Sequence, residues 1–164
     1  MKRLNIALLH YSCPPVVGGV EEVIKQQALL FQRYFQKVKI FAGMGSQFSN
    51  NLEVEINPLL GSRDKRVVYV HKMAKEGETK PLESLTRKIY RYLSHALQDF
   101  DMLIAHNVLT MRYNLALTYA LLRLAESDSI PVISWNHDSP YFYPDYPSYL
   151  DKEPWTVLKQ YNPK

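Results

Sequence analysis

Apolar residues along the chain alternate between short strand-like runs and longer stretches with helical spacing. Continuous apolar runs of five or six residues are typical of strands that are covered on both faces, and shorter alternating runs fit half-buried strands. Five segments have one of these patterns: 4–9, 37–43, 52–58, 101–106 and 130–135. We expect a strand at each.

Between these segments, apolar residues recur at three- and four-residue intervals. This spacing predicts helices over 20–34, 82–97 and 110–126, followed by a short helix over 153–161. Pro154 suits the first turn of that last helix. The segment 61–81 has the weakest pattern, and in it we expect a strand at 67–70 and a turn at 77–81.

Strands that alternate with helices in this way predict an α/β fold, with a parallel sheet and helices on both of its faces. The chain has no internal repeat or linker-like tract, so residues 1–164 are interpreted as one domain. Ligands of such sheets bind beyond the carboxyl ends of the strands. Those ends are followed by 10–19, by His106 and Asn107, and by 136–138.

The composition is 46% hydrophobic and 22% charged, as in a soluble globular protein. The net charge of +4 comes from scattered lysines and arginines, and it is compatible with a phosphorylated ligand or an anionic membrane surface. We expect no nucleic-acid partner, because the sequence contains no Arg-rich stripe or known nucleic-acid-binding module.

Cys13 is the one cysteine, which excludes an internal disulfide and is consistent with a reducing cytoplasm. The first apolar run is too short for a signal peptide, and no run approaches the length of a membrane span. We therefore expect a cytoplasmic protein, with peripheral membrane association left open.

The first strand is followed by "PPVVGGVEEV", which places Gly18 and Gly19 at the start of a helix. A helix N-terminus attracts anions, and glycine lets them approach the backbone without a Cβ in the way. Glu21 either balances the helix dipole or accepts hydrogen bonds from sugar hydroxyls. The alternative is a glycine turn that ends a loop and needs no ligand.

The stretch "WNHDSPYFY" follows the strand at 130–135 and carries His137 and Asp138. Both side chains can bind sugar hydroxyls, and His137 can also bind a phosphate oxygen. The alternative is a His–Asp pair that braces its own loop. His106 and Asn107 occupy the equivalent position after 101–106, where Asn107 or Thr110 can instead cap the next helix.

Other chemistries lack their motifs. The chain has neither the dinucleotide fingerprint G-x-G-x-x-G nor a P-loop, and no closely spaced histidine pair indicates a metal site. Cys13 lacks the arginine that a cysteine phosphatase requires six residues later, so it is interpreted as a packing residue. The tyrosines of 141–149 fit a packed loop or an acceptor platform.

The loop "PPVVGGVEEVI", together with "HN" and "WNHD" after later strands, resembles the N-terminal Rossmann-like domain of retaining GT-B glycosyltransferases. The resemblance covers nearly the whole chain. It implies one half of a two-domain enzyme that transfers a sugar from a nucleotide-sugar donor to an acceptor hydroxyl with retention. The acceptor class stays open: a sugar, a lipid-linked molecule or another small molecule.

The resemblance also assigns roles. It implies that Gly18 and Gly19 approach the donor diphosphate, and that His137 is the catalytic or sugar-contacting residue with His106 and Asn107 nearby. No cofactor or obligatory metal is implied, because the nucleotide sugar is a substrate.

One part of the family pattern is missing. In this family the C-terminal domain carries a Glu-x7-Glu motif, and no glutamate pair here has that spacing. We therefore expect an N-terminal, acceptor-side domain that ends before its last strand, lacks the C-terminal donor-binding domain and is inactive alone. The alternative function is a non-catalytic α/β module that binds a phosphorylated or glycan ligand.

Overall fold

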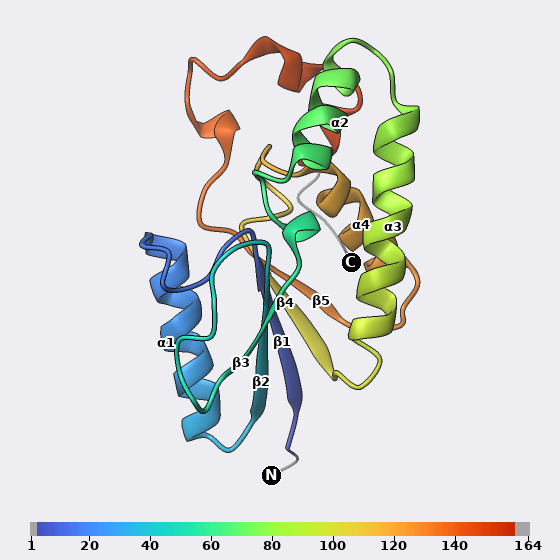
Figure 1. The fold of residues 1–164 in the computed structure, drawn as a ribbon. Helices are drawn as coiled ribbons and strands as arrows, with labels where there is room; N and C mark the ends of the chain where they lie inside the picture. Colours follow the sequence, from blue (N-terminus) through green and yellow to red (C-terminus); the bar gives the residue numbers. More distant parts are fainter. Residues whose placement is uncertain (1–2, 160–164) are drawn as a thin grey trace.

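The computed structural model describes residues 3–159, which form a five-stranded parallel sheet with helices on both faces (Figure 1). The strand order is β3-β2-β1-β4-β5. The strands are β1 (Asn5–His10), β2 (Lys37–Ala42), β3 (Glu53–Ile56), β4 (Met102–His106) and β5 (Val132–Trp135). This confirms the five expected strands and the Rossmann-like α/β class.

Strand β1 lies at the centre of the sheet, and its side chains divide between two cores. Ile6 and Leu8 pack with one cluster of buried residues, whereas Ala7 and Leu9 pack with the other. Successive side chains of a strand point to opposite faces, so a continuous apolar run fills both cores. The run therefore indicated the two-sided burial correctly.

The two faces are covered unequally. Helix α1 (Gly19–Arg33) covers one face alone, and α3 (Lys80–Ala96) and α4 (Leu115–Glu126) lie on the other. Helix α2 (Lys65–Lys75) packs against α3 beyond the carboxyl ends of the strands (Figure 1). The described chain also contains four short 3-10 turns, one between β3 and α2 and three in the segment that follows β5. They are η1 (Pro58–Leu60), η2 (Pro140–Phe142), η3 (Ser148–Asp151) and η4 (Trp155–Lys159).

The predicted strand at 67–70 is wrong, because these residues belong to helix α2. Asp64 caps the helix by accepting a hydrogen bond from the Arg66 N–H. Val67, Val70 and Ala74 are buried at helical spacing, and this packing outweighs the strand preference of β-branched residues. A turn at Gly77 then leads into α3.

The predicted start of the fourth helix is also wrong. Helix α4 begins at Leu115, and its N-cap is Asn114 rather than Asn107 or Thr110. The Asn114 side chain is fully buried, accepts from the Leu117 N–H, and donates to the carbonyls of Leu59 and Gly61. One side chain thus caps α4 and ties it to the η1 turn.

Trp155 anchors the C-terminal segment to the large core. It is 2% exposed and makes edge contacts with His71 and Tyr149. Pro154 lies directly before η4, and its carbonyl accepts a hydrogen bond from the Tyr119 hydroxyl. The expected helix over 153–161 is therefore a 3-10 turn in its described part, and positions 160 and 161 lie outside the described residues.

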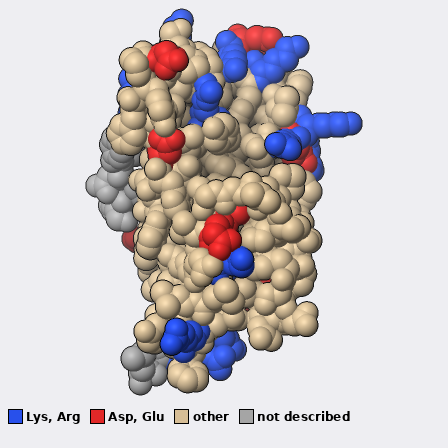
Figure 2. Space-filling view, turned by 90° about the vertical axis from the view of Figure 1, so that its left-hand side faces the viewer, with Lys and Arg blue, Asp and Glu red and all other residues tan. Residues whose placement is uncertain are grey.

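Within residues 3–159, no helix has the length and apolar character that a membrane crossing requires. The side of the molecule formed by α1 carries few charged side chains across its middle (Figure 2). Lysines and arginines on that side gather toward its upper and lower ends.

Candidate functional site

A cavity of about 520 Å³ opens at the carboxyl edge of the sheet. Residues from four separate segments line it, and they include most of those singled out from the sequence. The lining residues used below are His10, Gly19, Asn107, Tyr113, His137 and Asp138. The topology brings them together because parallel strands all end at the same edge.

The two glycines of the first loop have different surroundings. A Cβ on Gly18 would lie 2.2 Å from Glu21 Oε2, so Gly18 makes room for a side chain of its own helix. A Cβ on Gly19 would meet nothing within 4 Å. Gly19 is therefore the position where main chain at the N-terminus of α1 lies open to the cavity.

Glu21 points back into the domain. Its side chain is 8% exposed and accepts a hydrogen bond from the Ser12 hydroxyl. The carboxylate also packs against Gly18 and acts electrostatically on His10, whose pKa it tends to raise. Glu21 thus braces the glycine loop in the absence of ligand, and the structure does not place it among the lining residues of the cavity.

Three histidines form a connected row at this edge. His10 Nδ1 lies 2.7 Å from the backbone carbonyl of His106, and His106 Nδ1 lies 3.1 Å from His137 Nε2. On its other side, His106 Nε2 lies 2.8 Å from Oε1 of Gln27. His106 is fully buried, whereas His137 is exposed to the cavity.

These contacts fix the protons of the row. A carbonyl only accepts, so His10 carries its proton on Nδ1. With the Gln27 amide oriented so that its oxygen faces His106, the proton of His106 lies on Nε2, which leaves His106 Nδ1 to accept from His137 Nε2–H. His137 then has its Nδ1 lone pair available as an acceptor.

The electrostatics of the row favour neutral imidazoles. Burial, with smaller contributions from the neighbouring His137 and His10, lowers the pKa of His106 to about 4. Burial also lowers the pKa of His10, partly opposed by its bond to the His106 carbonyl, and it lowers the pKa of His137. All three rings are therefore uncharged at neutral pH, as the assigned hydrogen bonds require.

Asn107 holds the loop that carries His137. Its φ is 59°, a left-handed conformation that asparagine tolerates better than most residues. Its Oδ1 accepts from the backbone N–H groups of His137 and Asp138 at 3.1 and 3.0 Å. Thr110 adds a bond from its hydroxyl to the Asp138 carbonyl at 2.8 Å. Asn107 thus positions the loop, and the small part of it that is exposed lines the cavity.

Both oxygens of the Asp138 carboxylate have partners within their own segment. Oδ1 accepts from the Ser139 N–H at 2.7 Å, and Oδ2 accepts from the Tyr143 hydroxyl at 3.1 Å. The carboxylate also lines the cavity, and each oxygen has a further lone pair for a ligand hydroxyl. Loop bracing and ligand contact are therefore compatible at Asp138.

The tyrosines of 141–149 mostly serve the loop itself. Tyr141 donates to the Leu150 carbonyl at 2.7 Å and packs edge-to-face on Tyr146. Tyr146 in turn bonds the Asp151 carboxylate. Tyr143 is 53% exposed, and its hydroxyl contacts the site residue Asp138. The packed-loop alternative thus describes most of this segment.

Gln27 was missed in the sequence, and His10 was included only as the first residue of the segment 10–19, with no role assigned to it. Gln27 lies on α1 and contacts His106 from across the sheet edge. The sequence could have indicated Gln27, because it is a polar residue three positions after Ile24 on the stripe of α1 that is otherwise apolar and buried.

Within residues 3–159, no group of three or more His, Cys, Asp and Glu side chains is arranged to hold a metal ion.

Cys13 is fully buried, and burial raises the pKa of its thiol to about 11, so it is a poor nucleophile.

No family model matches the chain, and a search of curated proteins found no match to it either.

Proposed function

We propose that the chain is the acceptor-side domain of a retaining GT-B glycosyltransferase, which transfers a sugar from a nucleotide-sugar donor to an acceptor hydroxyl. The observation that carries the proposal is the open main chain at Gly19, at the N-terminus of α1, in the same cavity as His137 and Asp138. An anion-binding helix end beside two polar side chains suits a ligand that has both phosphate and sugar groups.

In the proposed reaction, the donor diphosphate lies near the N–H groups of the first turn of α1. These groups carry partial positive charge and stabilise the negative charge that develops on the leaving phosphate. A second Rossmann-like domain supplies the remaining donor contacts. The bond from the anomeric carbon to the diphosphate oxygen breaks, and the acceptor hydroxyl attacks from the same face and gives its proton to the departing diphosphate, so the configuration at the anomeric carbon is retained.

His137 positions the sugar. His137 donates its Nε2–H to His106, so its Nδ1 is free to accept a hydrogen bond from a sugar hydroxyl. Because burial lowers its pKa, the ring is neutral and does not form an ion pair with the donor phosphates. Asp138 accepts from a second sugar hydroxyl. The nucleotide sugar is a substrate, and the proposed reaction uses no cofactor or obligatory metal. We place it in the cytoplasm, the compartment with which the single cysteine is consistent.

The test is a transfer assay of the full-length protein with a panel of nucleotide sugars. We expect His137→Ala to lose at least about a hundredfold in kcat/KM, because the reacting sugar loses its orientation. His95→Ala is the matched control, since His95 is exposed on α3 and away from the cavity.

Circular dichroism must show that both variants keep the wild-type fold. Full activity of His137→Ala would contradict the proposed site. Binding of a nucleotide sugar or glycan without any transfer would instead support the non-catalytic binding module.

A further inference from the structure

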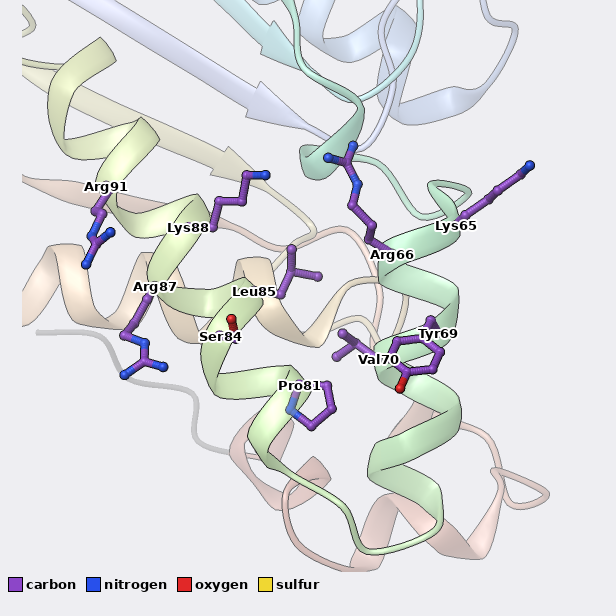
Figure 3. A pocket seen from close by; sticks show the side chains of 10 residues that line it. All are labelled: Lys65, Arg66, Tyr69, Val70, Pro81, Ser84, Leu85, Arg87, Lys88 and Arg91. Carbon is purple, nitrogen blue, oxygen red and sulfur yellow. The ribbon is translucent and has the colours of Figure 1, made fainter.

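A second, larger cavity lies away from the candidate site, in a groove between α2 and α3 (Figure 3). Its volume is about 850 Å³. Val70 and Leu85 are buried and form an apolar floor. The rest of the lining comes from both helices and consists of Lys65, Arg66, Tyr69, Pro81, Ser84, Arg87, Lys88 and Arg91.

The groove is strongly cationic. Five of its lining residues are lysine or arginine, and none is acidic. Of these five cations, only Arg66 forms an ion pair with another described residue, which is Asp64 at 2.7 Å. The side of the molecule formed by α1 shows no comparable cluster across its middle (Figure 2). Although the net charge of the chain is small, positive charge is concentrated at this groove.

Helix α2 also presents apolar side chains beside these charges. Val68 and Tyr69 are 55% and 54% exposed, and they lie between the exposed Lys65 and Lys72 at three- and four-residue spacing. The opposite stripe of the same helix is buried in the core. A surface stripe of lysine with aromatic and aliphatic side chains is typical of helices that lie in a membrane interface.

The cations are spread over the face rather than gathered at one point. Arg66 and Lys88 extend from the two helices toward the groove, whereas Arg87 and Arg91 lie along α3 and Lys65 extends outward (Figure 3). All five are exposed. A single small phosphate would contact only a few of them. A surface that carries many anionic groups can neutralise all of them at once.

We propose that the α2–α3 face binds an anionic membrane surface. Lipid phosphates occupy the groove between Arg66 and Lys88, and Tyr69 and Val68 lie at the level of the headgroups. The segment that precedes α2 connects this face to the candidate site, because Ser62 lines the first cavity and Arg66 lines the groove. The bound membrane would therefore lie close to the cavity.

Membrane binding itself does not depend on the proposed transfer reaction. The one consequence that rests on the proposed function is that the acceptor is lipid-linked and reaches the cavity from the bilayer surface. A binding assay without donor or acceptor therefore tests the membrane proposal separately from the transferase proposal.

The experiment is co-sedimentation of the 164-residue chain with vesicles of phosphatidylcholine alone and of phosphatidylcholine mixed with phosphatidylglycerol. We expect binding to the anionic vesicles only, and release at high salt. The combined variant Arg87→Gln, Lys88→Gln and Arg91→Gln should weaken binding about a hundredfold, because each removed charge contributes about fivefold.

The matched control removes three exposed cations near the opposite edge of the sheet, through Arg3→Gln, Arg33→Gln and Lys37→Gln. It should bind nearly as well as the unchanged chain, and Tyr69→Ser should bind several-fold more weakly. Equal binding to neutral and anionic vesicles, or an equal loss in the control, would overturn the proposal. So would binding of inorganic phosphate or RNA at this face without any binding to anionic vesicles.

Discussion

The polar groups at the carboxyl edge of the sheet and those of the α2–α3 groove are held in very different ways. At the edge, His106 is fully buried and contacts both Gln27 and His137, and Asn107 fixes the following loop. In the groove, the cations are exposed lysines and arginines, and only Arg66 has an ion-pair partner among the described residues. The edge has fixed proton positions, which suits the orientation of one ligand, whereas the groove can adapt to a broad anionic surface.

Acidification should have the largest effect. It acts on two histidines, the buried His106 at the edge and His71 on the core side of α2, and not on the cations of the groove. His106 and His71 both have a pKa lowered to about 4, chiefly by burial, while the unfolded chain titrates near 6.5. Between pH 6.5 and 4 the unfolded state therefore binds more protons, and stability falls as the pH falls. Each group contributes up to about 3 kcal/mol, which is fully present above pH 6.5. Lysine and arginine stay charged throughout.

Urea unfolding across this pH range measures the effect. His71→Gln provides the comparison, because its amide oxygen can still accept the Leu115 N–H that His71 Nε2 accepts at 3.0 Å. This variant should lose less stability on acidification than the unchanged chain. An unfolding free energy that stays flat from pH 7 to 4 would contradict the buried, neutral state of these rings.

Removing the Asn107 amide should have the next largest effect. Asn107→Ala leaves the N–H groups of His137 and Asp138 without their acceptor and strains the left-handed backbone, so we expect a loss of about 2 kcal/mol or more. Asn107→Gly removes the same bonds without the strain and should cost less. Thermal unfolding distinguishes the two, and a neutral Asn107→Ala would exclude the positioning role.

Gln27→Leu tests the proton assignments more finely. It removes the acceptor of His106 Nε2–H and should cost about 1 kcal/mol, because a buried donor loses its partner. Nitrogen-15 NMR of the imidazoles should show the Nε2–H form of His137 in the unchanged chain and a mixture of forms in the variant. Unchanged tautomers in Gln27→Leu would show that Gln27 does not control the row.

The smallest expected effect lies in the groove. Asp64→Ala removes the cap of α2 and should reduce stability by about 1 kcal/mol. The bond to Arg66 chiefly holds the pKa of Asp64 at about 2, but the Arg66 side chain is half-exposed, so the bond adds little stability. Because Arg66 is then unpaired, anionic vesicles should bind the variant slightly more tightly. Weaker binding would contradict the role of Arg66.

The sequence predicted the fold well where one pattern dominated. Strand β1 is a continuous apolar run that fills both cores, and the residues after β1, β4 and β5 meet at one edge because parallel strands must end together. The segment 67–70 misled because it contains three valines and a tyrosine in a row. Its helical signal lay in the Asp64 cap and in the spacing of Val67, Val70 and Ala74.

The start of α4 misled for a related reason. Val108, Leu109 and Met111 are buried, but they lie in the loop that precedes the helix, so apolar spacing alone extended the helix too far. Within the site, Gln27 reaches His106 only through the packing of α1 against the sheet edge. The difference between Gly18 and Gly19 likewise depends on where the Glu21 side chain lies, which no local pattern determines.

The most direct test of the central claim is the transfer rate of Gly19→Val in the full-length protein. A Cβ at this position meets nothing within 4 Å, so we expect the fold to accept the valine while its side chain covers the open N-terminus of α1. Val17→Ala, at a fully solvent-exposed neighbour, is the control. We predict about a hundredfold loss in kcat/KM for the donor in Gly19→Val alone. Equal donor kcat/KM in both variants and the unchanged protein would contradict the account.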